Sequence, residues 1–229
     1  MPRRVIAFVV AAIVVVVLGL VVYFVFVQDT RYANENQLLQ SQTFDDVVWS
    51  KQSITVSADV AKAPDGTTTA DKVVETATKA THFTGASLTI PAGSTFTASI
   101  HVKAAGRSRV IVYWGKSGPP YTRGGMNVDL TNGTFKEFDA GNPARVTNRH
   151  VANLGDGWYR ISMTVRADAT STDGYLAVVL HDGAATEYFG DITKGVYVWG
   201  AQVQRGARVG EYMATTTTAR YTQPPKTGS

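Results

Sequence analysis

The chain of 229 residues contains no cysteine. This absence excludes disulfide bonds, thiolate nucleophiles and cysteine ligands to zinc. The chain also lacks a strong excess of either charge. Arg3 and Arg4 account for two of the twenty-two basic residues, which leaves twenty basic against eighteen acidic residues in 29–229. Surfaces that bind nucleic acid normally show clustered Lys and Arg, so we expect no nucleic-acid partner.

Catalytic and metal-binding motifs are missing as well. The histidines lie in four separate segments, and none has a second His at the spacing of a metal site: His82, His101, His150 and His181. No Gly-x-Ser-x-Gly elbow occurs, and several aspartates fall in turns, where Asp bonds to its own backbone. We therefore predict no catalytic residue, no enzymatic activity and no metal centre. We expect the isolated histidines to lie on solvent-facing surfaces of strands.

One long hydrophobic run stands out, from Val5 through Val14 and Gly19 to Val27. It contains no charged residue, and eighteen of its twenty-three residues are Val, Ile, Leu or Phe. A buried core helix would carry a polar side. A signal peptide has a shorter apolar centre, roughly 7–15 residues, and ends in small residues. About 20 apolar residues cross a bilayer, so we predict an uncleaved signal anchor that forms a single transmembrane α-helix.

The charges beside this run predict its orientation. Arg3 and Arg4 precede it, whereas no excess of basic residues follows it. The positive-inside rule then places the N-terminus in the cytoplasm and residues 29–229 outside it. We expect the protein in the inner membrane, in contact with the lipid bilayer, with its remaining residues periplasmic or extracellular.

Beyond the anchor, the sequence alternates between apolar and polar residues with a period of two, and a helical period is not evident. Alternating runs occur at 95–103, 158–166 and 197–204, with shorter runs between them. Turn sequences such as Asn132-Gly133 separate these runs. About ten strands at this spacing predict an all-β jelly-roll β-sandwich. We divide the chain into stub and helix at 1–28, stalk at 29–42, sandwich at 43–213 and Thr/Pro-rich tail at 214–229.

Several stretches of the sandwich carry a resemblance. They are Gln42-Thr43-Phe44-Asp45-Asp46, Gly155-Asp156-Gly157-Trp158-Tyr159-Arg160 and Gly195-Val196-Tyr197-Val198-Trp199. In this order they resemble a jelly-roll domain of phage virion and tail proteins, which is similar to carbohydrate-binding modules of the concave β-sandwich kind. The resemblance implies the sandwich fold over about 42–213, places Trp49, Tyr197 and Trp199 in the core, and allows a structural Ca²⁺. It implies no other cofactor.

Carbohydrate sites on such sandwiches use exposed aromatic side chains as stacking platforms. Trp158 occupies the polar register of its strand beside Arg160, so it either packs in the structure or contacts a ligand. A second group of candidates surrounds the loop 115–125: Tyr113, Trp114, Tyr121, Arg109 and Arg123. Tyr175 and His181 lie in another strand.

Three functions fit these observations. The first is a non-catalytic accessory subunit that uses its helix and sandwich to dock onto other membrane-protein subunits of an envelope assembly. The second is a membrane-tethered, glycan-binding protein that resembles carbohydrate-binding modules. The third is a phage-derived virion or adhesion protein.

Overall fold

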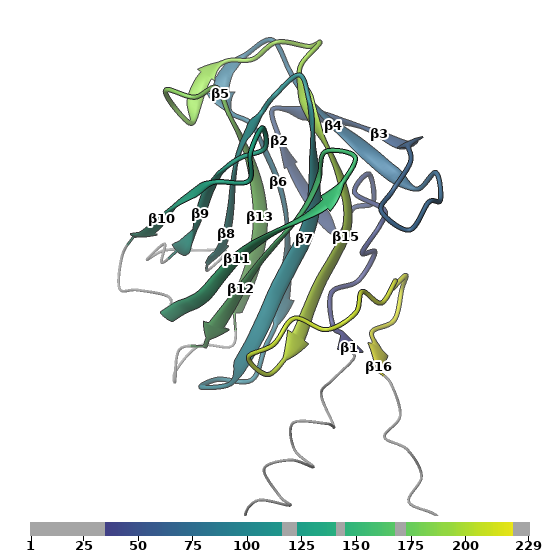
Figure 1. Ribbon diagram of the computed structural model, residues 1–229, viewed down its shortest axis with the longest axis vertical. Coiled ribbons are helices and arrows are strands. Elements are labelled where there is room, and N and C mark those ends of the chain that lie inside the picture. Colours follow the sequence, from purple (N-terminus) through teal and green to yellow (C-terminus); the bar gives the residue numbers. More distant parts are fainter. Residues whose placement is uncertain (1–34, 116–122, 141–144, 168–172, 222–229) are drawn as a thin grey trace, which may run out of the picture.

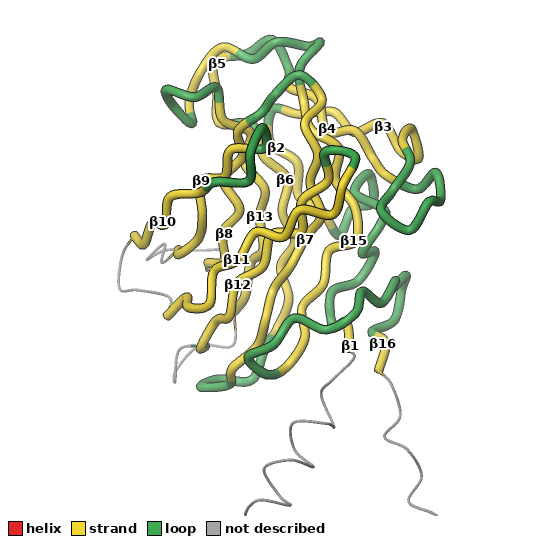
Figure 2. The backbone as a smooth tube through the Cα atoms, viewed as in Figure 1, coloured by secondary structure: helices red, strands yellow, loops and turns green. Residues whose placement is uncertain are grey.

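The computed structural model describes residues 35–115, 123–140, 145–167 and 173–221. This part of the chain consists of strands joined by turns and loops and contains no helix (Figure 1, Figure 2). The apolar run from Val5 to Val27 lies outside the described residues. Within them, no helical segment has the length and apolar character needed to cross a bilayer. The transmembrane helix therefore stays a prediction.

Six antiparallel strands form sheet I, in the spatial order β10-β9-β8-β13-β6-β2. In chain order they are β2 (Trp49–Gln52), β6 (Phe83–Thr89), β8 (Arg109–Gly115), β9 (Arg123–Asp129), β10 (Phe135–Ala140) and β13 (Asp173–His181).

Six further antiparallel strands form sheet II, in the order β11-β12-β7-β15-β4-β3. They are β3 (Ile54–Ala61), β4 (Ala70–Glu75), β7 (Thr95–Ala105), β11 (Arg145–Gly155), β12 (Trp158–Arg166) and β15 (Gly195–Arg205). Two short pairs complete the fold: β1 (Glu35–Asn36) with β16 (Arg220–Tyr221), and β5 (Lys79–Thr81) with β14 (Glu187–Phe189).

The two sheets pack face to face, and the chain crosses repeatedly between them. It passes from β6 in sheet I to β7 in sheet II, back to β8, and later from β12 to β13 and on to β15. Crossing between sheets in this way is the jelly-roll arrangement. The all-β sandwich predicted from period-two alternation is confirmed.

The main hydrophobic core fills the space between the sheets. Val112 and Leu176 of sheet I and Ile100 and Ile161 of sheet II are fully buried within it. At one end, Trp114 packs against Phe96 with ring centroids 4.5 Å apart. The alternation predicted for 95–103 and 158–166 therefore points the apolar residues inward, because each second side chain of a strand faces the opposite sheet.

The outer face of sheet II is covered by the chain itself. The segment 206–215, which we call the strap, follows β15 and lies over this face (Figure 1). Arg160 donates from Nη1 to the carbonyl of Gly210 at 2.7 Å, and Gln202 exchanges hydrogen bonds with the backbone of Glu211 and Met213. The polar residues of this face are therefore bonded to backbone groups of the strap rather than left to water.

For the first half of β15, the prediction of which side chains face the core is wrong. Val196 and Val198 point into the core, whereas Tyr197 and Trp199 point outward, and the inward phase resumes at Ala201. A register shift between Trp199 and Gln202 causes the change. A bulge inserts one extra residue and so reverses which face the following side chains occupy.

The folded part extends beyond the predicted limits of 43 and 213. In the expected stalk, Leu38 is buried in the core and Asn36 donates to the carbonyls of Ala201 and Met213 at 2.9 Å. In the expected tail, Thr215 is buried and its backbone NH donates to Ser41 Oγ. Described residues from 35 to 221 thus belong to one structure, with its first and last strands paired side by side (Figure 1).

Candidate functional site

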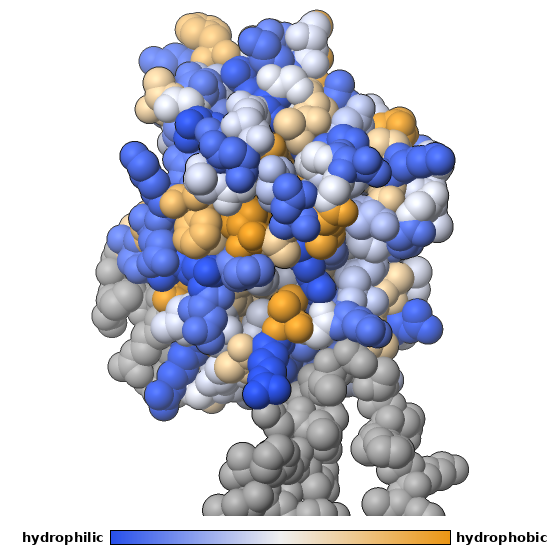
Figure 3. Space-filling model, viewed as in Figure 1, coloured by the Kyte–Doolittle hydropathy of each residue, from blue (hydrophilic) through white to orange (hydrophobic). Residues whose placement is uncertain are grey.

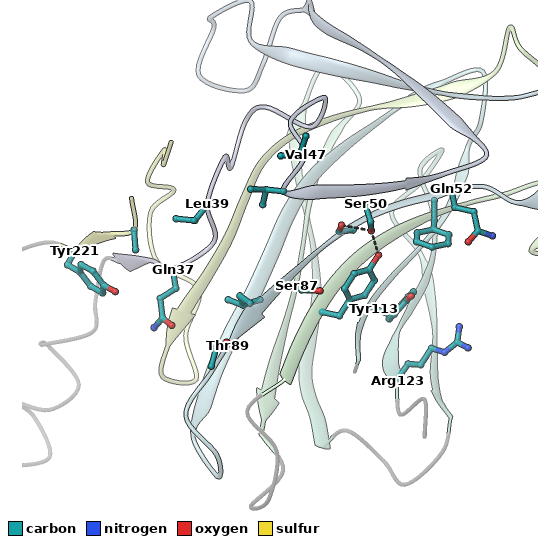
Figure 4. A pocket seen from close by; sticks show the side chains of 16 residues that line it. Gln37, Leu39, Val47, Ser50, Gln52, Ser87, Thr89, Tyr113, Arg123 and Tyr221 are labelled. Carbon is teal, nitrogen blue, oxygen red and sulfur yellow. Dashed lines mark hydrogen bonds between the residues drawn. The ribbon is translucent and has the colours of Figure 1, made fainter. Parts of the chain in front are cut away.

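The outer face of sheet I carries an open pocket of about 960 Å³. Its floor comes from alternate residues of β2, β6, β8, β9 and β13, those whose side chains face away from the core. One rim comes from segments beside the paired ends β1 and β16 (Figure 4). The described lining residues are Gln37, Leu39, Val47, Val48, Ser50, Gln52, Phe83, Gly85, Ser87, Leu88, Thr89, Tyr113, Arg123, Tyr175, Ala219 and Tyr221.

Two half-buried tyrosines lie at the centre of this floor. Tyr113 of β8 and Tyr175 of β13 stand on neighbouring strands, with ring centroids 6.3 Å apart and planes inclined by 41°. Glycine provides the room for the second ring. A Cβ added to Gly85 of β6 would lie 2.5 Å from Cζ of Tyr175. The Tyr175 ring therefore lies over the backbone of β6 because Gly85 has no side chain.

The hydroxyl of Tyr175 has a defined hydrogen-bond role. Ser50 Oγ donates to the carbonyl of Gly85 at 2.8 Å and lies 2.6 Å from Tyr175 Oη. A serine hydroxyl has one proton, and this proton is committed to Gly85. The phenol must therefore donate to Ser50, which leaves its oxygen as a hydrogen-bond acceptor for a ligand.

Both phenols stay protonated at neutral pH. Burial, together with the nearby Tyr175, raises the pKa of Tyr113 to about 12, and Arg123 opposes this rise. Burial also raises the pKa of Tyr175, against the hydrogen bond with Ser50. The guanidinium of Arg123 lies over the Tyr113 ring, with Cζ 5.6 Å from the centroid. The pocket thus combines an aromatic floor with neutral hydrogen-bonding groups and one cation.

The structure brings together some of the predicted site residues and separates others. Tyr113 and Arg123 share the pocket, with Tyr175 beside them. Arg109 lies on the same sheet face but outside the lining, where its Nη2 bonds to Asp129 Oδ2 at 2.8 Å. Tyr121 lies outside the described residues.

Two tryptophans predicted as contact residues are instead buried. Trp114 points between the sheets, where its indole lies against Gly174, so it belongs to the core. Trp158 is 3 % exposed and packs with Trp199 under the loop 61–70, and its Nε1 donates to the carbonyl of Lys62 at 3.1 Å. Arg160 beside it is half-buried and bonds to Ser99 Oγ and to the strap. Their strand register was correctly placed outside the core, but other parts of the chain cover that face.

The expectation of surface histidines also fails at three positions. His82, His101 and His181 are buried, and only His150 is exposed. His101 packs edge-on against Trp199 and bonds through Nδ1 to the carbonyl of Gly200 at 3.1 Å. Within the described residues, no group of three or more His, Asp or Glu side chains is arranged to hold a metal ion.

Sequence reasoning missed the pocket residues of β2 and β6, among them Ser50, Gln52, Phe83 and Ser87. They occupy alternate positions of their strands, so the signal is present in the sequence. What it lacks is the strand order: β6 pairs with β2 on one side and with β13 on the other. This pairing alone brings Ser50 beside Tyr175, 125 residues away in the chain.

The chain is similar to several solved structures at low sequence identity. No protein-family model matches the chain, and a search of curated proteins finds no match. Among solved structures, the CBM22-1 xylan-binding domain of Paenibacillus barcinonensis Xyn10C is 11% identical, with 78% of this chain and 96% of that chain covered and a TM-score of 0.42.

Two further solved structures have similarly low identities and TM-scores. A structure described as "CBM4 structure and function" is 15% identical, covers 72% of this chain and 100% of that chain, and has a TM-score of 0.41. The enzymatically active domain of tailspike protein 4 from bacteriophage CBA120 is 7% identical, with 73% of this chain covered and a TM-score of 0.43. The match spans only 21% of that tailspike chain.

Proposed function

We propose that the sandwich binds glycan chains in the pocket on the outer face of sheet I. The observation that supports this most directly is the pair Tyr113 and Tyr175, held 6.3 Å apart on a floor of polar residues. An aromatic ring presents a large apolar face at small entropic cost, and the CH-bearing face of a pyranose ring is apolar. Two such rings on adjacent strands suit consecutive sugar units.

The surrounding polar groups match the second requirement of sugar binding. Each sugar hydroxyl donates and accepts hydrogen bonds, and the pocket offers both functions. The Tyr175 oxygen accepts, since its proton is held by Ser50. The Gln52 amide and the Thr89 hydroxyl, which lie along the same floor, both donate and accept. A mostly preformed pocket with few convergent polar groups is the usual form of a small-ligand site.

Calorimetric titration with xylan, galactan, mannan and cello-oligosaccharides tests this proposal. We expect binding by the wild type and a loss of at least about tenfold in affinity for Tyr175→Ala, equivalent to about 1.4 kcal/mol. Phe189→Ala is the matched control, because Phe189 is an exposed aromatic residue outside the pocket. Absence of binding to every oligosaccharide, or equal effects of the two substitutions, would contradict the proposal.

The apolar run 5–27 favours a membrane tether for this glycan-binding domain, with the sandwich outside the cytoplasm. Fractionation of cells that express the full chain or a chain lacking residues 1–28 tests this. We expect the full chain in the membrane fraction, released by detergent and not by alkaline carbonate, and the shortened chain in the soluble fraction. Carbonate release of the full chain would contradict a spanning helix.

The accessory-subunit and phage-derived hypotheses stay predictions, as does the absence of catalysis. Size-exclusion chromatography of the detergent-extracted full chain distinguishes the first of them. A complex with co-purifying subunits would favour it, and a stable monomer would count against it.

A further inference from the structure

The charged groups that line the pocket are of one sign, positive. Among the described residues that line it, Arg123 carries the only formal charge. The rest are amides, hydroxyl groups, glycine and apolar side chains. Carboxylates are strong acceptors for sugar hydroxyl groups because their hydrogen bonds are charge-assisted. The described lining residues instead offer neutral acceptors and one charged donor, Arg123, and no carboxylate.

The acidic residues on this face of sheet I lie beside the pocket and not in its lining. Asp129, at the end of β9, bonds to Arg109 at 2.8 Å. Asp173 opens β13 opposite Thr89, one step along the same face from Tyr175. Neither contributes to the pocket lining, so Arg123 is the one charged residue among the described residues that line the tyrosine floor.

Arg123 also stands where a bound sugar would present a substituent. It is the first residue of β9, exposed, with its guanidinium over the Tyr113 ring. Figure 4 shows it at one end of the pocket, with Tyr221 and Leu39 at the other. A guanidinium offers a planar fork of donors that fits a carboxylate, sulfate or phosphate in two-point contact. A sugar bound against the Tyr113 side chain therefore has its ring substituents near this fork.

We infer that the preferred ligand is an acidic saccharide, whose carboxylate, sulfate or phosphate group binds at the Arg123 end of the pocket. This inference rests on the proposed glycan-binding function and narrows it to one substrate class. The tyrosines bind the sugar rings, whereas Arg123 selects for the anion. At the opposite end, Leu39 and Tyr221 form an apolar rim (Figure 4), and no charged residue lines the pocket there among the described residues.

Matched probes test the inference: cellohexaose and its forms that carry a carboxylate, a sulfate or a phosphate at C6. Titration in 20 mM and 300 mM NaCl should show at least about tenfold tighter binding of one or more acidic forms at low salt. This preference should shrink at high salt, because exposed charges are screened within about 10 Å. The three acidic forms identify which anion the site prefers.

Two arginine variants supply the control. Arg123→Gln should remove the preference for the acidic form over neutral cellohexaose. Arg109→Gln changes the net charge equally on the same sheet face, outside the lining, and should keep the preference. Thermal unfolding checks that both variants fold.

The outcomes separate the two proposals. Equal or tighter binding of neutral cellohexaose, abolished by Tyr175→Ala, overturns the acidic preference and leaves glycan binding in place. A preference lost equally in both arginine variants also overturns it, because net charge would then be the cause. Failure of all four probes and of the neutral oligosaccharide panel overturns both proposals.

Discussion

Single residues decide the shape of the pocket floor, and Gly85 is the clearest case. Its Cα faces the Tyr175 ring, and an added Cβ would lie 2.5 Å from both Cζ and Oη of that ring. The backbone of Gly85 also accepts the hydrogen bond from Ser50 that fixes the role of the Tyr175 hydroxyl. One methyl group at this position would therefore disturb both the stacking surface and its hydrogen bond.

We predict that Gly85→Ala lowers glycan affinity about tenfold or more, because the Tyr175 ring must move off the strand. Stability should fall by roughly 1–3 kcal/mol, as for overpacked sites. Ser57→Ala, at an exposed position of β3 outside the pocket lining, removes only a hydroxyl and serves as the control. Calorimetric titration and urea unfolding measure the two effects. Unchanged glycan affinity in Gly85→Ala would show that the position of the Tyr175 ring does not affect binding.

A second residue-scale effect concerns His101 on the opposite sheet. Burial, together with the charge of Arg160, lowers the pKa of His101 to about 4, against the hydrogen bond with Gly200. An unfolded histidine has a pKa of about 6.5. Between these values the unfolded chain binds the proton and the folded chain does not. Folding stability is therefore retained above pH 6.5 and falls as the pH falls towards 4.

We predict that His101 removes up to about 3 kcal/mol of stability over this range, at about 1.4 kcal/mol per pKa unit. Urea unfolding at several pH values from 7.5 to 4.5 measures the loss. His101→Gln should flatten the curve, whereas His150→Gln, at an exposed position, should leave it unchanged. Equal curves for wild type and His101→Gln would assign the pH dependence to other groups, such as His181, whose pKa is also lowered by burial.

At the scale of elements, the bulge in β15 determines what its two halves do. Gly200 adopts a φ of 58° at the register shift between Trp199 and Gln202. The shift turns Trp199 to the outer face, where it packs with Trp158 and Tyr212, and returns Ala201 and Val203 to the core. A strand without the bulge would place either Trp199 or Val203 on the wrong face.

We predict that Gly200→Ala destabilises the fold by more than the roughly 1–2 kcal/mol of a left-handed backbone alone. The added Cβ would also lie 2.9 Å from Nδ1 of His101. Gly206→Ala is the control, since Gly206 has a φ of 91° and open space around its Cα. Equal losses in urea unfolding would show that contact with His101 adds nothing.

For the whole molecule, the two ends of the described chain close the structure. β1 pairs with β16, and Thr215 bonds through its hydroxyl to the carbonyl of Leu38 and through its NH to Ser41. The same region supplies one rim of the pocket, through Gln37, Leu39, Ala219 and Tyr221. Fold stability and the pocket rim therefore depend on the same pairing.

We predict that deletion of residues 214–229 lowers the free energy of unfolding by several kcal/mol, because it exposes Leu38 and removes the buried hydrogen bonds of Thr215 with Ser41 Oγ and with the carbonyl of Leu38. Deletion of 222–229 leaves every described contact in place and is the control. Denaturant unfolding of both chains measures the difference. A stable protein after the longer deletion would show that this segment acts as a dispensable tail.

The sequence by itself determined the fold class. Alternation with a period of two fixes which side chains share a strand face, and turn residues limit the strands, so the all-β sandwich follows from local rules. It also indicated Tyr113, Arg123 and Tyr175 as residues outside the core. Local rules of this kind need only neighbouring residues, which is why they succeed without knowledge of the fold.

Only the tertiary structure decided which outward face is free. Trp158 and Tyr113 both occupy outward positions, but the loop 61–70 and the strap 206–215 cover the first, whereas the second lines an open pocket. Strand order, the bulge at Gly200 and the packing of residues 35–42 and 214–221 result from contacts between distant parts of the chain. Such contacts depend on the pairing of whole strands, and no single stretch of sequence contains that information.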